Sequence, residues 1–146
     1  MPASSTTTAD DLLSQAWKPR QLPGYIGAAG PLWTKREGDA WAYGLLASEQ
    51  HLNPAGIVHG GALTTLVDHA LSTVAWQACE RTPCVTLQLD MHFMHSVTVG
   101  QFALARAHVV RSMRSLLFMR AEVAVNGHLV ASAQAIVKRL GEPAGS

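Results

Sequence analysis

The hydrophobic pattern between residues 62 and 78 predicts the longest helix of the chain. Apolar residues recur there three and four positions apart, which is the period of a helix with one buried side. The opposite side carries no Lys or Arg and a single acid, Asp68, before Glu80. Because a solvated helix face usually holds more charge, we expect this second side to face a site or a partner subunit. The expected buried stripe consists of Leu63, Leu66, Val67, Ala70, Val74 and Ala78.

Strand patterns flank this helix, two before it and four after it. Turn residues separate the runs, and Asn126-Gly127 is the strongest hairpin signal in the chain. The expected strands cover 32–36, 40–48, 84–93, 101–111, 115–125 and 128–138. We therefore predict an α+β fold in which one long helix crosses one antiparallel sheet, with the last four strands in a meander.

The segment before the first strand is less regular. Residues 9–17 are typical of a short helix with two acids in its first turn, and Pro19 ends it. Residues 20–31 are rich in Gly and Pro and are expected to form a long ordered loop. Its Leu22, Tyr25 and Ile26 either line a pocket or pack over a sheet edge. We predict a single domain over 9–140, between flexible tails at 1–8 and 141–146.

Composition narrows the class of protein. Hydrophobic residues make up 48% of the 146 residues and charged residues only 14%, which favours burial of part of the surface against another subunit. The net charge of +1 gives no broad attraction to nucleic acid, and no apolar run approaches the length of a membrane span. With two cysteines, Cys79 and Cys84, and no export pattern at its start, the chain is expected to be cytoplasmic.

Candidate chemistry gathers where the long helix begins. The stretch 53–61 ends in His59-Gly60-Gly61, so bare backbone N–H groups open the helix. Such groups have no partners within the helix and lie at its positive end, where they hold an oxygen that carries negative charge. Asp68 lies two turns further along, too deep in the helix to be a cap. An anion site and an isolated carboxylate together indicate an active site.

The spacing of this stretch resembles a known family. The pattern Asn-x-x-Gly-x-x-His-Gly-Gly over 53–61, followed by Asp68, is similar to that of the hotdog-fold acyl-CoA thioesterases of the phenylacetate-degradation (PaaI) type. The resemblance runs from about residue 31 to residue 138. It implies the hotdog fold, in which an antiparallel sheet wraps around one long central helix. It also implies homodimers, which commonly pair again into homotetramers.

Two of the matching residues carry the reaction that the resemblance implies. Hydrolysis of a thioester needs a donor for the oxyanion and a base or nucleophile, and the Gly60 N–H and the Asp68 carboxylate match these roles. Eight residues along one helix separate them by roughly 12 Å, too far for both to touch one thioester carbon. We therefore predict composite sites in an obligate dimer, where Gly60 of one subunit meets Asp68 of the other across a two-fold axis.

Four further residues take roles from the resemblance. Asn53 matches the position whose amide orients the water or nucleophile, and His59 matches the histidine that shapes the helix entry. Thr86 matches a position that helps hold the water, and Ser72 matches a hydroxyl seen in some relatives. Each also has an ordinary structural explanation. Asn53 fits a turn residue before Pro54, and His59 fits a structural histidine whose hydrogen bonds are satisfied. Thr86 and Ser72 fit an ordinary strand residue and an ordinary helix residue.

Substrate contacts are expected from Gly61 and Thr65, beside the site, and from two cations. The charges of Arg111 and Arg114 suit the phosphates of coenzyme A, although a role as solvated surface cations fits them equally. The acyl group needs an apolar pocket. Its candidate lining residues, which equally suit the core, are Trp76, Met91 and Phe93.

We predict hydrolysis of an aryl- or medium-chain acyl-CoA to free acid and CoA, with no cofactor and no nucleic-acid or membrane partner. No metal site is expected, because His92 and His95 point to opposite faces of a strand and no cysteine or clustered acid completes a ligand set. The competing hypothesis is a non-catalytic module that binds or senses acyl thioesters on the same fold, and a hotdog dehydratase is a third. Thiol release from acyl-CoAs separates the first hypothesis from the second.

Overall fold

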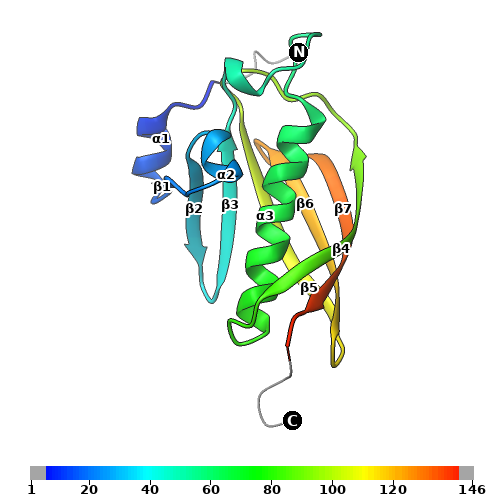
Figure 1. Cartoon of the computed structure of the whole chain (residues 1–146). Helices are drawn as coiled ribbons and strands as arrows, with labels where there is room; N and C mark the ends of the chain where they lie inside the picture. The colour runs from blue at the N-terminus through cyan, green and yellow to red at the C-terminus, as the bar shows by residue number, and fades with distance from the viewer. Residues whose placement is uncertain (1–5, 142–146) are drawn as a thin grey trace.

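The structure is a computed structural model that describes residues 6–141 (Figure 1). The predicted tails therefore lie largely outside the described residues. The elements before the long helix are α1 (Ala9–Ser14), β1 (Lys18–Arg20), α2 (Tyr25–Ala28), β2 (Leu32–Glu37), β3 (Ala40–Leu46) and the 3-10 helix η1 (Glu49–His51). Then come α3 (Gly60–Ala78), β4 (Cys84–Phe93), β5 (Phe102–Ser112), β6 (Leu116–Val125) and β7 (His128–Arg139). The predicted fold class is confirmed, while residues 20–31 contain α2 where a loop was expected.

The seven strands form one antiparallel sheet in the order β1-β2-β3-β5-β6-β7-β4. The predicted meander is wrong at its first step, because β4 pairs with β7 and not with β5. After α3 has crossed the sheet, the chain enters it at the far edge, and the segment after β4 leads back to β5 beside β3 (Figure 1). Within the described residues, β4 is therefore an edge strand with one free side.

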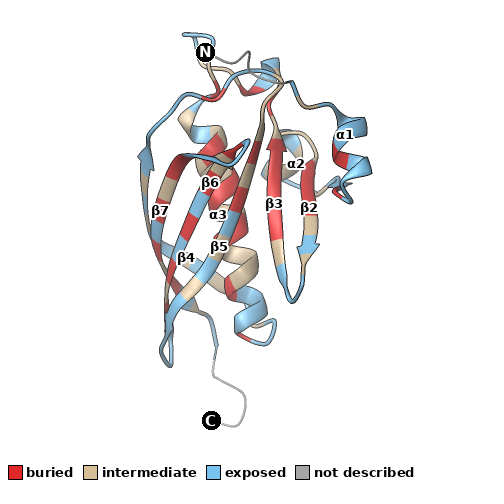
Figure 2. Cartoon of the chain, turned by 180° about the vertical axis from the view of Figure 1, so that it is seen from behind, coloured by how far each residue is buried: buried red, intermediate tan, exposed pale blue. Residues whose placement is uncertain are grey.

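The core lies between α3 and the concave side of the sheet. Buried residues alternate along β5, β6 and β7 and form a stripe on α3 that faces them (Figure 2). The stripe contains Leu63, Leu66, Val67 and Ala70 as predicted, continues through Leu71 and Ala75, and leaves Ala78 exposed. This packing fixes the rotation of α3, so that Asp68 is turned away from the deepest part of the core and is half-buried.

A second apolar cluster covers the opposite face of the sheet at β2, β3 and β5. Trp17 packs edge-on against Phe102 with ring centroids 4.8 Å apart, and Leu12 of α1 is buried beside them. The Thr8 hydroxyl caps α1 by accepting the Asp11 N–H. In return the Thr8 N–H donates to the Asp11 carboxylate at 2.9 Å, and this hydrogen bond lowers the pKa of the Asp11 carboxyl. No helix among the described residues has the length and apolarity that crossing a bilayer requires.

Candidate active site

The start of α3 is built so that one backbone N–H stays available. His59 is the N-cap, and its Nδ1 accepts the Gly61 N–H at 2.8 Å. Its carbonyl accepts the Ala62 N–H at 2.9 Å. The Gly60 N–H has no partner within residues 6–141, so it is the free donor at the positive end of α3. His59 therefore shapes the entry of α3 through this capping contact.

Asn53 builds the loop that leads into α3. Its Oδ1 accepts the Ala55 N–H at 2.9 Å and the Ile57 N–H at 3.3 Å, which is the behaviour of a turn residue. Asn53 also lines a cleft of about 340 Å³ beside Gly60. We call this the Gly60 cleft, and its other principal residues are Leu63, Phe93, Met94, His95 and Val97.

Phe93 lies directly over the first turn of α3. A Cβ placed on Gly60 would lie 3.2 Å from the Cζ of the Phe93 ring. The absence of a side chain at Gly60 therefore lets the ring approach the backbone, and the ring itself is about half exposed at 52%. Of the three predicted lining residues of the acyl pocket, Trp76, Met91 and Phe93, only Phe93 lines this cleft. Trp76 lies at the other end of α3 with Arg81 over its ring.

Asp68 is held by a strand that lies beside α3. The Thr86 hydroxyl donates to Asp68 Oδ1 at 2.8 Å. A bulge between Thr86 and Gln88 makes this contact possible, because the extra residue, Leu87, leaves the ladder and lets Thr86 point to the helix side. The two side chains line a second cleft of about 370 Å³, the Asp68 cleft, together with Thr64, Thr65, Leu87, Gln88 and Leu89.

A third cleft lies on the other flank of α3, against α2. It has a volume of about 350 Å³, and we call it the Tyr25 cleft. Thr65 lines both this cleft and the Asp68 cleft, and Gly61 lines the Tyr25 cleft, so both predicted substrate-binding residues of α3 face a cavity. The remaining principal residues of the Tyr25 cleft are Ala28, Ala29, Leu52, His59 and Ala62.

The residue after Asp68 is a half-buried histidine. The His69 ring meets the Tyr43 ring edge-on with centroids 5.9 Å apart. Burial lowers the pKa of His69, and the negative charge of Asp68 opposes part of that shift. Burial likewise raises the pKa of the Tyr43 hydroxyl. Both side chains are therefore neutral near pH 7.

The structure leaves several predicted site residues apart from these clefts. Ser72, Arg111 and Arg114 line none of the three clefts in a single chain. Gly60 and Asp68 line separate clefts, as their spacing along one helix requires. Residues 6–141 contain no group of three or more His, Cys, Asp or Glu side chains placed to hold a metal ion.

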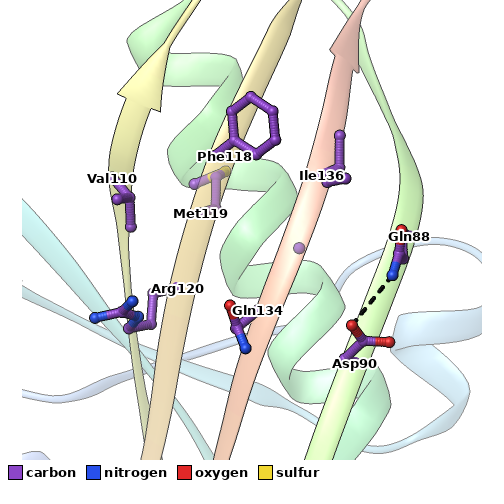
Figure 3. Close-up of a pocket in the computed structure, with 9 residues that line it drawn as sticks. Gln88, Asp90, Val110, Phe118, Met119, Arg120, Gln134 and Ile136 are labelled. Atoms are coloured by element: carbon purple, nitrogen blue, oxygen red, sulfur yellow. Dashed lines mark hydrogen bonds between the residues drawn. The ribbon is translucent and has the colours of Figure 1, made fainter.

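A further hollow of about 220 Å³ lies on the outer face of the sheet (Figure 3). Its side chains come from β4, β5, β6 and β7, with α3 behind the sheet. Gln88 donates to Asp90 at 3.1 Å at its rim. None of the residues predicted for the site lines this hollow, and Gln88 is the residue that it shares with the Asp68 cleft.

Sequence reasoning missed the role of His51. This residue is 6% exposed, its Nδ1 accepts the Ser48 N–H at 3.0 Å, and its Nε2 meets the Ala29 carbonyl. It thereby ties the segment after α2 to η1, beside the Tyr25 cleft. The available signal was the spacing of Ser48 and His51, which is that of a helix cap and its reciprocal partner.

Comparison with known proteins places this geometry in a family. The sequence model of the thioesterase superfamily matches residues 55–131, more than half of the chain and the part that holds α3 through the start of β7. Mouse acyl-coenzyme A thioesterase 13 is 33% identical over 86 residues, which cover 57% of this chain and 61% of the relative. The chain thus spans about three-fifths of the length of this curated relative.

Solved structures agree in fold. Zebrafish thioesterase superfamily member 2 matches with a TM-score of 0.73 and 25% identity over 82% of this chain and 88% of its own. A mutant of the phenylacetic acid degradation protein PaaI from Thermus thermophilus matches with a TM-score of 0.69 and 30% identity over 79% of this chain and 97% of its own. On these grounds the chain belongs to the thioesterase superfamily.

Proposed function

We propose that the protein is an acyl-CoA thioesterase, which hydrolyses the thioester of an aryl- or medium-chain acyl-CoA to free acid and CoA. One observation carries this proposal: the Gly60 N–H is left without a partner within residues 6–141, while the neighbouring Gly61 and Ala62 N–H groups are satisfied. The names of mouse acyl-coenzyme A thioesterase 13 and of PaaI support the substrate class. The free thiols Cys79 and Cys84 support a reducing compartment such as the cytoplasm.

The Gly60 N–H is the proposed oxyanion donor. When the thioester carbonyl is attacked, negative charge moves to its oxygen, and a donor already aimed at that position stabilises the transition state without reorganising. The dipole of α3 adds partial positive charge at the same point. Loss of one such donor typically raises the barrier by about 3–4 kcal/mol.

Asp68 is the proposed base or nucleophile. As a base it takes a proton from water, the hydroxide adds to the carbonyl carbon, and the C–S bond breaks while Asp68 returns the proton to the leaving sulfur, which releases CoA as its thiol and the free acid. As a nucleophile it attacks the carbonyl carbon, the C–S bond breaks to expel the CoA thiolate and leave an anhydride between Asp68 and the acyl group, and water then hydrolyses the anhydride. In both routes the Thr86 hydroxyl holds Oδ1 and leaves Oδ2 free to react.

We propose that β4 brings the two groups together in a homodimer. Along α3, Thr86 at one end of β4 touches Asp68, and Phe93 at the other end lies over Gly60. If the free edges of two β4 strands pair antiparallel about an axis near Leu89, the two ends exchange places, and Asp68 of one subunit faces Gly60 of the other. If the two-fold axis instead passed through Asp90, the Asp90 carboxylates of the two subunits would lie opposite each other, and the repulsion between like charges disfavours that register.

The exposed apolar residues of β4 support this interface. Leu87 is 56% exposed and Val85 is 42% exposed at the edge of the sheet, where unpaired backbone groups favour pairing with another strand. The resulting sheet would run through both subunits and enclose each Asp68 cleft against the partner's Gly60 cleft.

An acyl-CoA panel tests the proposed function. We expect wild-type protein to release thiol from one or more aryl- or medium-chain acyl-CoAs, as measured with a chromogenic thiol reagent. Asp68→Asn should lower kcat by about a hundredfold or more, since a positioned base contributes about 10²–10⁴-fold. Asp39→Asn, at an exposed turn, is the matched control and should leave kcat unchanged. Saturable binding of acyl-CoA without thiol release would instead support the acyl-thioester sensor.

A further inference from the structure

We propose that the Tyr25 cleft receives the acyl group of the substrate, and that the closed space behind it limits the length of that group. The proposal rests on the thioesterase function proposed above and adds the position of the acyl site. It is carried by three features of the structure: an apolar route from Asp68, a wall supplied by α2, and an end that is closed.

The route from Asp68 passes over Thr65. This residue lines both the Asp68 cleft and the Tyr25 cleft. Its hydroxyl donates to the Gly61 carbonyl at 2.8 Å, one turn back along α3, so the polar end of the side chain is already satisfied. The Thr65 methyl group is what remains to contact a ligand, which suits an apolar chain leaving the reaction centre.

The wall opposite α3 is supplied by α2. Ala28 and Ala29 of this wall meet Ala62 of α3 to give a lining of small apolar side chains, and Tyr25 is 76% exposed at the mouth. An exposed aromatic ring over a shallow apolar lining suits contact with a flexible or planar apolar group. Because α2 lies outside the matched residues 55–131, this wall belongs to a part of the chain that the family match does not cover.

The far end of the cleft is closed. Behind Ala29, Ala62 and Thr65 lies an apolar void of only about 10 Å³, at the lower limit of the space that one water molecule needs. Ile26 of α2 bounds this void and is half-buried, whereas the other large residues around it, Leu32, Leu45 and Leu66, are core residues. Ile26 is therefore the residue whose truncation deepens the cleft while leaving the core in place.

The closed end is held by His51. The Ser48 N–H donates to Nδ1, so the proton of the neutral ring lies on Nε2 and is donated to the Ala29 carbonyl. Both ring nitrogens are thus used, in a side chain that is 6% exposed. This contact ties Ala29 to η1, and the His51 carbonyl in turn accepts the His59 N–H at the start of α3 at 2.7 Å. The two hydrogen bonds together oppose a shift of the segment after α2 that would lengthen the cleft.

The test compares the length preference of Ile26→Ala with that of wild type. Straight-chain acyl-CoAs in steps of two carbons are assayed for kcat/KM, and the matching non-hydrolysable thioether analogues are assayed for Kd by calorimetry. Truncation removes three side-chain carbons, so the longest chain that is accepted should grow by about two to three carbons. Since one methylene in an apolar pocket changes kcat/KM by roughly 10–200-fold, kcat/KM for the longer chain should rise by about tenfold or more in Ile26→Ala.

Two further variants decide the interpretation. Ile136→Ala, on the outer face of the sheet, is the matched control and should keep the wild-type preference. Equal preferences in Ile26→Ala and wild type would overturn the proposal. A shift in Phe93→Ala alone would also overturn it and would place the acyl group in the Gly60 cleft. A shift in Kd for Ile26→Ala in a protein that releases no thiol would support the acyl site while rejecting the hydrolase function.

Discussion

The hydrogen bond between Thr86 and Asp68 gives a sharp test of the proposed reaction centre. Thr86→Val keeps the branched shape of the side chain and removes the hydroxyl that donates to Asp68 Oδ1 at 2.8 Å. The strand should be unaffected, since valine has a high preference for β structure. We therefore expect an unchanged unfolding midpoint and a loss confined to turnover.

The expected size of the loss follows from the contact. A hydrogen bond to a charged group is worth about 1.5–3 kcal/mol, and about 1.4 kcal/mol corresponds to tenfold in rate. Asp68 is half-buried, so water replaces part of the lost contact. We expect kcat to fall by about tenfold with little change in KM, and Thr86→Ser, which restores a hydroxyl, to recover most of the activity.

A double-mutant cycle shows whether Thr86 acts through Asp68. If its hydroxyl only positions the carboxylate, Thr86→Val should have almost no effect on the residual rate of Asp68→Asn, because the group that it holds has already been altered. A tenfold loss in both backgrounds would mean that the two residues act independently. Wild-type kcat in Thr86→Val would refute the positioning role altogether.

Two further predictions concern assembly and pH. Leu87→Lys, at the free edge of β4, should convert the proposed dimer to monomers in sedimentation and abolish turnover. Val110→Lys, similarly exposed on β5, should leave the proposed dimer and its activity intact, and a dimeric, active Leu87→Lys protein would exclude the β4 interface. Burial holds the pKa of His69 in the folded protein below its ordinary value of about 6.5, so the unfolded chain binds more protons below that pH and stability falls as the pH decreases. His69→Gln should flatten the dependence of the free energy of unfolding on pH, measured by urea unfolding between about pH 5 and 7. His128→Gln, at an exposed position, is the control and should retain that dependence. An unchanged pH dependence in His69→Gln would contradict its assignment to His69.

The order of the elements from β2 onwards and the start of the long helix were predictable from local sequence, whereas β1 and α2 were not predicted. Gly60 and Gly61 mark the beginning of α3, and Asn126-Gly127 joins β6 to β7 as its composition indicates. The position of β4 was not predictable in this way. Each strand shows only its own alternation, while the choice of neighbour depends on where α3 delivers the chain, which is a property of the whole fold.

The site shows the same division between local and distant information. The capping of Gly61 by His59 and the turn around Asn53 involve residues two to four positions apart, so the motif contains them. The contacts of Thr86 with Asp68 and of His51 with the Ala29 carbonyl span 18 and 22 residues, and no spacing rule encodes them. Gly60 and Asp68 are meanwhile kept apart by the rigidity of one helix, which is why the sequence alone already pointed to a second subunit.

The bulge in β4 has a consequence for comparing this protein with its relatives. Counting alternate residues backwards from Leu89 reaches Leu87, not Thr86, although Thr86 is the one that faces α3. A relative whose strand has no extra residue would carry its hydroxyl two positions before the equivalent of Leu89. An ungapped alignment would therefore pair that hydroxyl with Leu87, and a one-residue gap is needed for the two hydroxyl positions to coincide.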